Sequence, residues 1–218
     1  MEDWNENEVV HPLKCVLVGD AAVGKTCLIV SYTTNGFPQH YTATAFDNYS
    51  GKVFNDKIVV RVDKRPIQLQ LHDTAGQASF DSLRPLCYED ADVFVVVYSV
   101  SEPSTFHSIL QHWLPEISRR SPSTPIILVG TQVDLRWKAM RETVSTAKGR
   151  ALAAHIGAVE FFECSALTQY NLKQMFDAAI LAGLENKRVP AKSTKSHKSS
   201  AIKHGLFQRF IDITKKLI

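Results

Sequence analysis

The sequence predicts an α/β fold of three layers, α/β/α, built on a mostly parallel six-stranded sheet with one antiparallel edge strand. Apolar, strand-sized runs alternate with helical patterns from about residue 13 to residue 184, which is typical of βα units around a parallel sheet. Two of these runs, 91–100 and 125–130, are apolar almost throughout, as in strands that are covered on both faces. A glycine-rich turn joins the first run to a helix. The 218 residues are enough to bury one core without disulfides.

The elements are assigned in chain order. Residues 13–18 form the first strand, and the helix after the glycine turn reaches about residue 32. The segment 67–71 alternates between apolar and polar side chains and pairs with 53–62 in an antiparallel hairpin at the edge of the sheet. Further strands are expected at 91–100, at 125–130 and around 161–162, and helices at 104–119, 144–155 and 171–184.

Charge divides the chain into four regions. An acidic arm, 1–12, precedes the domain 13–185, and a basic linker, 186–204, precedes the C-terminal segment 205–218. Residues 186–218 hold nine Lys or Arg and one acid, so the formal net charge of +3 combines a basic tail with a slightly acidic body. On a helical wheel, the segment 205–218 separates completely into an apolar and a polar arc, which predicts an amphipathic helix.

The four cysteines, Cys15, Cys27, Cys87 and Cys164, include no CxxC pair. They are expected to be reduced thiols of an intracellular protein. The sequence contains neither the pattern of a signal peptide nor an apolar run of 18 residues, so we expect no membrane-spanning segment.

The segment GDAAVGKT matches the phosphate-binding pattern GxxxxGK[ST] of P-loop proteins, after a strand and at the start of a helix. Its backbone N–H groups and the positive end of the helix are expected to cradle phosphates. Lys25 offers a positive charge to the outer phosphates, and Thr26 offers its hydroxyl to Mg²⁺. The nucleotide contacts expected here are Gly19, Ala21, Ala22, Val23, Gly24, Lys25, Thr26 and Cys27.

Motifs on further loops separate the classes of P-loop protein. The segment DTAGQ at 73–77 follows the strand 67–71, which places a carboxylate near the metal. With Thr44 upstream, TQVD at 131–134 and SAL at 165–167, it closely resembles the Ras superfamily of small GTPases.

The resemblance is most specific to one branch of that superfamily. The segments 41–49, 84–88 and 163–169 resemble the Rho family, and TTNGFP, RPLCY and IILVGTQVDLR are most similar to its atypical Wrch/Chp branch. The resemblance covers about residues 13–184. It implies a signalling switch that binds GTP or GDP with Mg²⁺ and hydrolyses GTP.

The resemblance also implies roles for individual residues. Thr26 and Thr44 would contact Mg²⁺ directly, and Asp73 would contact it through water. Gln77 would orient the attacking water, and Gln77, Lys25 and Thr44 would be the catalytic residues. The amide of Gly76 would donate to the terminal phosphate.

A second set of implied residues recognises guanine. Asp134 would accept the N1 and N2 protons of the base, which adenine cannot match, and a backbone amide at 165–167 would reach O6. Phe37 would stack edgewise on the base. The other implied contacts are Tyr41, Thr131, Gln132, Leu135, Ser165, Ala166 and Leu167.

The implied partners are effector proteins of the Rho type, kinases or adaptors, and exchange factors. The resemblance places the effector surface on Phe46, Asn48 and Tyr49 of the first switch loop and on Arg84 and Leu86 of the second. It implies a monomer that acts in actin organisation, cell shape, polarity or migration, without nucleic acid.

The sequence departs from the family pattern at four places. Ala21 stands where most members have glycine, and its methyl group should obstruct an incoming arginine finger, which predicts slow, GAP-resistant hydrolysis and a GTP-biased switch. Gln132 replaces a lysine, which predicts faster nucleotide release, although glutamine can keep some of the contacts. The stretch 46–73 is longer than usual, with FNDKIVV the added segment, and the stretch 134–144 is shorter than the Rho insert helix.

The tail carries no cysteine for the lipids that Rho proteins use. We expect residues 187–218 to attract an anionic membrane surface through basic charge and the apolar arc. The expected location is therefore the cytoplasm with association to the inner face of the plasma membrane or of endomembranes. A helix that binds a partner protein and an idle or nuclear-localising tail are the alternatives.

Two other functions compete with the enzyme. The first is a non-hydrolysing scaffold that stays bound to GTP and is regulated by expression and location, which Ala21 favours and Gln77 opposes. The second is a P-loop nucleotide kinase, which Asp73 and Asp134 oppose. His72 and Trp113 are interpreted as surface or packing residues.

Overall fold

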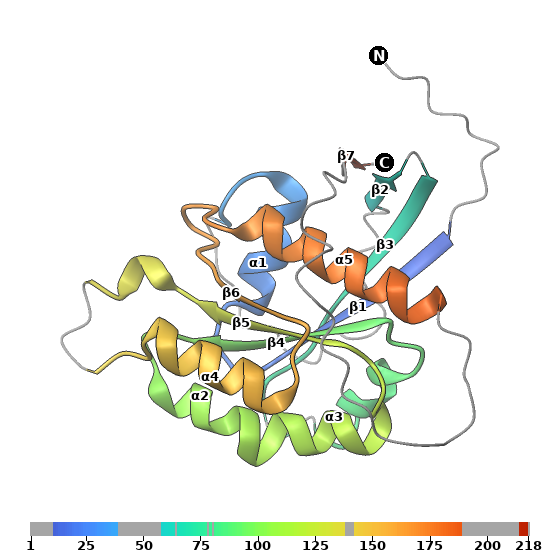
Figure 1. Cartoon of the computed structure of the whole chain (residues 1–218). Coiled ribbons are helices and arrows are strands. Elements are labelled where there is room, and N and C mark those ends of the chain that lie inside the picture. The colour runs from blue at the N-terminus through green and yellow to red at the C-terminus, as the bar shows by residue number, and fades with distance from the viewer. Residues whose placement is uncertain are drawn as a thin grey trace.

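The computed structural model describes residues 11–38, 58–63, 65–77, 79, 81–137 and 142–188, together with the backbone of 214–217. In this part of the chain, helices cover both faces of a single sheet (Figure 1), which confirms the predicted three-layer α/β/α fold. The strands lie in the order β6-β5-β4-β1-β3-β2-β7. Their bounds are β1 His11–Val18, β2 Ile58–Val62, β3 Arg65–Asp73, β4 Val93–Ser99, β5 Ile126–Thr131, β6 Glu160–Glu163 and β7 Thr214–Leu217.

The sheet is parallel except at β2, which runs antiparallel to both of its neighbours. β1 pairs in parallel with β3 on one side and with β4 on the other, so the order of the strands reverses at β1. In open α/β sheets, ligands bind outside the carboxyl ends of the strands at such a reversal. The topology therefore directs attention to the loops that follow Val18, Asp73, Ser99 and Thr131.

The helices form two layers (Figure 1). The helices α1 and α5 lie on one face of the sheet, and α2, α3 and α4 lie on the other. Among the described helices, none combines the length and the apolar character needed to cross a bilayer. Their bounds are α1 Lys25–Thr34, α2 Pro103–Ser108, α3 Leu114–Arg120, α4 Thr146–Ile156 and α5 Leu172–Arg188.

The core consists of two apolar clusters, one on each face of the sheet. Because side chains alternate along a strand, Cys15 and Leu17 of β1 face one cluster and Val16 faces the other. On the first face, Tyr32 of α1 stacks on Phe176 of α5 with ring centroids 4.1 Å apart. Burial on both faces explains why the central strands are apolar almost throughout.

The structure confirms all six predicted strands and changes two of the helices. The predicted helix 104–119 is divided by a π-helical turn, Ile109–Trp113, that joins α2 to α3. Pro115, in the first turn of α3, has no N–H to donate to an earlier carbonyl, which accounts for the irregular ladder here. α5 reaches Arg188, so residues 186–188 belong to the helix and not to a linker.

The C-terminal segment differs from the prediction. Thr214–Leu217 forms strand β7 and pairs with β2 from Ile58↔Leu217 to Arg61↔Thr214, so the predicted helix over 205–218 is wrong at these four residues. The physical reason lies in the sheet, because β2 without β7 would expose a row of backbone N–H and C=O groups. A helical wheel considers only side chains and omits this backbone demand. β7 consequently takes the edge position that was predicted for the hairpin.

Candidate functional site

The loop between β1 and α1 runs very close to strand β4. At Gly19, where φ is 150°, an added Cβ would lie 2.1 Å from the carbonyl oxygen of Val97. Only glycine fits this approach. The loop is also held from outside, because the hydroxyl of Thr131 lies 2.6 Å from the carbonyl oxygen of Val23. The sequence pattern GxxxxGKT therefore folds into a compact turn at the point where the strand order reverses.

Lys25 lies inside this loop with only 6% of its surface exposed. Its Nζ donates hydrogen bonds to the carbonyl oxygens of Gly19, at 2.7 Å, and Asp20, at 2.8 Å. Burial lowers the pKa of the Lys25 amine to about 8, against the opposing effect of the Asp73 and Asp20 carboxylates. A buried ammonium held only by neutral carbonyls and nearby acids is well suited to an anionic ligand.

A hydroxyl and a carboxylate meet beside this ammonium. Thr26 Oγ1 donates a hydrogen bond to Asp73 Oδ2 at 2.5 Å, which joins the first turn of α1 to the end of β3. Hydroxyl and carboxylate oxygens are the ligands that Mg²⁺ prefers, usually with retained water and phosphate oxygens. The pair therefore fits a magnesium site in residue type and position, as the sequence predicts for Thr26 and Asp73.

The chain after Asp73 lies against the phosphate loop. A Cβ added at Gly76 would lie 2.4 Å from the backbone nitrogen of Ala21 and 2.5 Å from the carbonyl oxygen of Gly19. Any other residue at this position would have to displace the loop backbone. The exposed Ala21 therefore lies next to the segment that carries Gln77, as the predicted conflict at Ala21 requires.

Arg84 holds this second loop in place and was predicted to contact effectors. The residue is only 2% exposed. Its guanidinium donates to the carbonyl oxygens of Ala75, at 2.8 Å, and Gln77, at 3.0 Å, and to the carboxylate of Asp81, at 2.6 Å. Burial alone would lower the pKa of Arg84, but the hydrogen bond to Asp81 and the charge of Glu116 raise it. Arg84 thus positions the loop from inside, and in this structure its side chain is unavailable to a partner.

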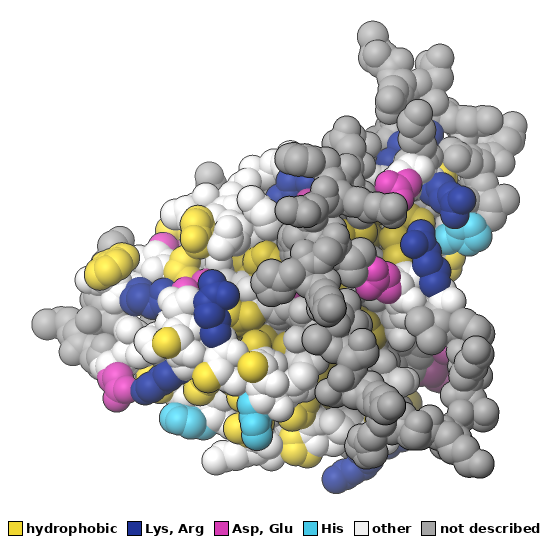
Figure 2. All heavy atoms as spheres, in the orientation of Figure 1, with side chains coloured by type: hydrophobic (Ala, Val, Ile, Leu, Met, Phe, Trp, Pro, Cys, Tyr) yellow, Lys and Arg dark blue, Asp and Glu magenta, His cyan; other side chains and the backbone are white. Residues whose placement is uncertain are grey.

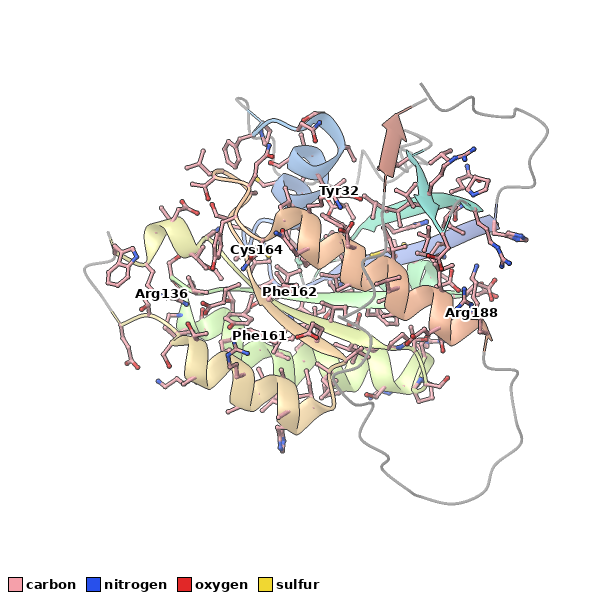
Figure 3. The ribbon with its side chains drawn as sticks, turned by 45° about the horizontal axis from the view of Figure 1, so that its top comes forward. Tyr32, Arg136, Phe161, Phe162, Cys164 and Arg188 are labelled. Carbon is pink, nitrogen blue, oxygen red and sulfur yellow. The ribbon has the colours of Figure 1, made fainter. Side chains whose placement is uncertain are left out.

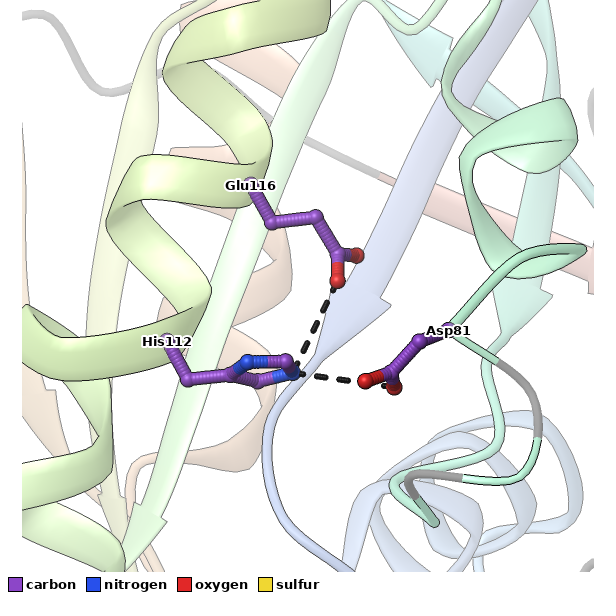
Figure 4. A group of neighbouring side chains, drawn as sticks. All are labelled: Asp81, His112 and Glu116. Carbon is purple, nitrogen blue, oxygen red and sulfur yellow. Dashed lines mark ion pairs between the residues drawn. The ribbon is translucent and has the colours of Figure 1, made fainter.

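Figure 4 shows three side chains beside Arg84 that could be mistaken for a metal site, namely Asp81, His112 and Glu116. His112 Nε2 lies 3.8 Å from Asp81 and 3.6 Å from Glu116. Both carboxylates already bind the Arg84 guanidinium, at 2.6 and 2.8 Å. The charge that a cation would supply is therefore already present in Arg84, so we interpret the cluster as part of the Arg84 anchor.

Trp113 extends this anchor to the phosphate loop. Its indole nitrogen donates to the carboxylate of Asp20 at 2.6 Å, and its ring lies 4.5 Å below the Arg84 guanidinium. From the sequence, Trp113 is expected only at the surface or in packing contacts. Its contact with the phosphate loop depends on the π-helical turn and on segments that are distant in sequence. The local sequence pattern therefore gives no indication of this contact.

The guanine motif forms the other side of the site. Ser165 Oγ donates to Asp134 Oδ1 at 2.6 Å, which joins the loops after β5 and β6. The amide of Ser165 donates to the carbonyl oxygen of Tyr170. Of the three residues predicted to offer an amide to the base, this leaves Ala166 and Leu167 as candidates. Thr131 and Leu135 lie in the same region, at the end of β5 and in the turn Val133–Leu135 that follows.

Gln132 connects this guanine motif to the phosphate loop. Its Nε2 donates to the carbonyl oxygen of Ala22 at 3.0 Å, and its Oε1 accepts from Ser99 at 2.6 Å and from Ser101 at 3.1 Å. The glutamine therefore keeps a bridge between the two loops. This geometry favours retained contacts over the faster nucleotide release predicted from the missing lysine.

An ion pair that the sequence analysis missed supports the same loops. Arg136 binds Glu163 through two hydrogen bonds, at 3.0 and 2.5 Å, and also donates to the carbonyl oxygen of Val144. Thr146 donates to Glu163 at 2.8 Å as well. Figure 3 shows Arg136 and Cys164 at the end of the sheet where β5 and β6 finish. Because Arg136 lies two residues after Asp134 and Glu163 lies two residues before Ser165, the pair fixes the spacing of the two loops.

The remaining predicted residues fall into two groups. Phe37 is 42% exposed and Leu86 is 71% exposed, so both side chains are accessible to a ligand or partner. Cys27 is half-buried, and burial raises the pKa of its thiol, which opposes a redox role. The other group lies outside the described residues and comprises Tyr41, Thr44, Phe46, Asn48 and Tyr49.

The described site thus brings together a phosphate loop, a magnesium-type oxygen pair and a guanine-type carboxylate at the carboxyl ends of the strands. Residues 14–184 of the chain match the model of the Ras family. Proteins of this family are small GTPases, which bind GTP or GDP with Mg²⁺ and act as switches. The match spans most of the chain and includes every loop of the site, and the protein therefore belongs to the Ras family.

Proposed function

We propose that the protein is a Rho-type signalling switch that binds GTP or GDP with Mg²⁺, hydrolyses GTP slowly and recruits effectors while GTP is bound. The observation that carries this proposal is that two polar pairs lie on neighbouring loops at the carboxyl ends of the strands. Thr26 and Asp73 meet beside Lys25, and Asp134 meets Ser165 on the neighbouring loops. The first pair suits the metal and phosphates, and the second suits guanine.

In this proposal, Thr26 and Thr44 would hold Mg²⁺ directly and Asp73 would hold it through water, and the bound ion would supply charge neutralisation at the phosphates. Lys25 would exchange its two carbonyl contacts for phosphate oxygens, and Gln77 would orient water for attack. Gly76 lies against the phosphate loop, and its amide would donate to the outermost phosphate. Loss of that phosphate would release both switch loops.

The first experiment measures nucleotide content and base specificity. The protein is purified, and bound nucleotide is released and identified by chromatography. We expect GTP and GDP, with GTP in excess. The variant Asp134→Asn should lose guanine affinity and gain affinity for xanthine nucleotides, because its amide can donate where the carboxylate accepted. Equal binding of adenine and guanine nucleotides by the native chain would contradict the proposal.

The second experiment tests the predicted effect of Ala21. An arginine finger supplies about 10³–10⁵ in rate, and in this proposal the methyl group of Ala21, a residue whose backbone lies close to Gly76, obstructs such a side chain. We expect Ala21→Gly to raise single-turnover GTP hydrolysis in the presence of a Rho-type activating protein by at least about tenfold. Ala154→Gly, at an exposed position of α4, serves as the control for the loss of a methyl group. An unchanged rate in Ala21→Gly would show that the methyl group is tolerated.

The alternative function is a scaffold that stays bound to GTP and does not hydrolyse it. The same placement of Ala21 beside Gly76 favours it. The variant Gln77→Leu separates the two functions. A hydrolysing switch loses its measurable rate in this variant, whereas a scaffold shows the same background rate with either residue.

For partners and location, we propose effectors and exchange factors of the Rho type, with outputs in actin organisation, cell shape, polarity or migration. The exposed Leu86 supports a contact surface on the second switch loop. We also propose that the basic residues of 187–218 draw the protein to anionic membrane surfaces from the cytoplasm. Recovery of effectors by the GTP-loaded but not the GDP-loaded protein tests the first part.

A further inference from the structure

A cavity of about 380 Å³ lies at the end of the domain remote from the nucleotide site. Its size falls within the range of small-ligand pockets. Its floor is apolar and its rim is mostly basic. The lining residues are His11, Pro12, Val62, Asp63, Arg65, Ile67, Leu184, Lys187 and Arg188.

Two guanidinium groups on the rim have no acidic partner among the described residues. Arg65, at the start of β3, and Arg188, at the end of α5, are both exposed. Lys187 differs, because it binds the carbonyl oxygen of Pro12 and lies 3.0 Å from Asp92. Figure 3 places Arg188 at the end of α5 next to the start of β1.

Among the described residues at this end, the acids do not cancel the positive charge. Asp92 balances Lys187, and Asp63 on the rim offsets one of the two guanidiniums. Figure 2 shows Lys, Arg and His side chains gathered with acidic ones at this end of the molecule. An excess of positive charge remains on the rim of an apolar cavity, which suits an anion with an apolar part.

Strand β7 brings the basic tail to the same end. Arg188 lies on the rim, and Thr214 pairs with Arg61, two residues before Asp63. Residues 189–213 therefore leave and rejoin the described structure beside the cavity. Their sequence adds Lys192, Lys195, Lys198, Lys203 and Arg209 against the single acid Asp212.

We propose that this cavity binds the phosphorylated headgroup of an anionic membrane lipid, with Arg65 and Arg188 as the phosphate-binding residues. Guanidinium groups bind phosphate in a bidentate geometry. Docking at this end would point the carboxyl ends of the strands, and so the nucleotide site, away from the membrane. The proposal rests on the membrane association proposed above and assigns it a specific lipid site.

The test uses the full chain and vesicle co-sedimentation. One set of vesicles contains phosphatidylcholine with phosphatidylinositol bisphosphate, and the other contains phosphatidylcholine with phosphatidylserine at the same total charge. The variant Arg65→Glu/Arg188→Glu is compared with Arg119→Glu/Arg120→Glu, which makes the same charge change at exposed positions of α3. Circular dichroism confirms that both variants are folded.

We expect the native chain to prefer the bisphosphate vesicles. The cavity variant should bind these vesicles with at most about one tenth of the native affinity. The control should keep the preference. If both variants bound both kinds of vesicle more weakly to the same extent, total charge alone would explain the binding. This result would overturn the headgroup site.

Soluble inositol trisphosphate separates the proposals from each other. We expect it to compete with the bisphosphate vesicles and to shift the amide resonances of Val62 and Ile67 in the native chain only. Vesicle binding without these shifts would overturn the cavity and leave the tail as the membrane contact. Shifts without binding to any vesicle would overturn the membrane association, with a soluble phosphate as the ligand of the cavity.

Discussion

At the residue scale, Gln132 joins the guanine motif to the phosphate loop. Its side-chain amide donates to Ala22 in the phosphate loop and accepts from Ser99, at the end of β4, and from Ser101. An amide offers both a donor and an acceptor, so one side chain can link three segments. The cost of losing the lysine charge is therefore partly offset by hydrogen bonds.

This bridge predicts the effect of removing the glutamine side chain. Gln132→Ala should speed nucleotide release by about tenfold, equivalent to about 1.4 kcal/mol. Release of a fluorescent GDP analogue measures the rate. Gln111→Ala, at an exposed position of the π-helical turn, is the control and should match the native chain. A native rate in Gln132→Ala would mean that the bridge does not hold the loops.

The cysteines make a second prediction at this scale. Burial raises the pKa of Cys15 and of Cys164 to about 12, and it also raises the pKa of the half-buried Cys27 and Cys87. Because the thiolate is the reactive form, alkylation near neutral pH should leave Cys15 and Cys164 unmodified until the protein unfolds. Peptide mass spectrometry after iodoacetamide treatment measures this. Early modification of either would contradict the burial.

The same shifts determine the pH dependence of stability. The folded thiols of Cys15 and Cys164 keep their protons up to a pKa of about 12, whereas the ordinary value is 9.0. The folded state then binds more protons than the unfolded state between these values, so the free energy of unfolding falls as pH rises through this window. Cys15→Ala should show a smaller fall than the native chain in urea titrations at alkaline pH.

At the scale of elements, Arg84 joins the second switch loop to α3 and to the π-helical turn. Its guanidinium binds Ala75 and Gln77 on the loop, Glu116 on α3, and the ring of Trp113. Trp113 in turn binds the phosphate loop through Asp20. A continuous chain of side-chain contacts therefore connects the phosphate loop to α3.

Removing the Arg84 charge should destabilise the whole domain. Arg84→Met leaves the partly buried carboxylate of Glu116, whose side chain is 14% exposed, without its cation, and breaking a buried pair costs about 3–5 kcal/mol. Urea unfolding should show this loss in the free energy of unfolding. Arg119→Met, on the exposed surface of α3, should change it by no more than about 0.5 kcal/mol. If Arg84→Met lowered the free energy of unfolding as little as the control does, the contacts of Arg84 would contribute little to stability.

Strand β7 gives a prediction for the edge of the sheet. In an antiparallel pair, alternate residues donate toward one neighbour, so part of the amides in Ile58–Arg61 should be protected by β7 and part by β3. Deleting residues 214–218 should accelerate hydrogen exchange in the first part by more than about tenfold and leave the second part unchanged. The amides of β5, far from this edge, are the internal control. Unchanged exchange throughout β2 would argue against the pairing.

At the scale of the whole molecule, the sheet separates two functional ends. The carboxyl ends of β1, β3, β5 and β6 carry the nucleotide-binding loops, and the opposite end carries the basic cavity and the returning tail. The two ends are joined by strands that are buried on both faces. In the proposed membrane docking, a central sheet of this kind would keep the nucleotide site at a constant orientation while the opposite end of the domain binds the membrane.

The sequence by itself determined the fold class, the six strands and the order of the nucleotide motifs, because these depend on local signals. Apolar runs mark strands with both faces buried, and the loop at Gly19–Thr26 needs its residue types at adjacent positions for close backbone approach. The family match agrees with this part of the prediction. The predicted roles of Thr44 and of residues 46–49 stay predictions, because they lie outside the described residues.

Only the tertiary structure decided which distant residues share one environment. Arg84 is buried and binds Glu116 of α3, and Trp113 reaches the phosphate loop. Arg136, in the loop after β5, pairs with Glu163 at the end of β6. Residues 214–217 form a strand where the side-chain pattern predicted a helix, since an open sheet edge offers backbone hydrogen bonds that no helical wheel records. Each of these outcomes depends on which segments the sheet places side by side, and that proximity is a property of the folded chain.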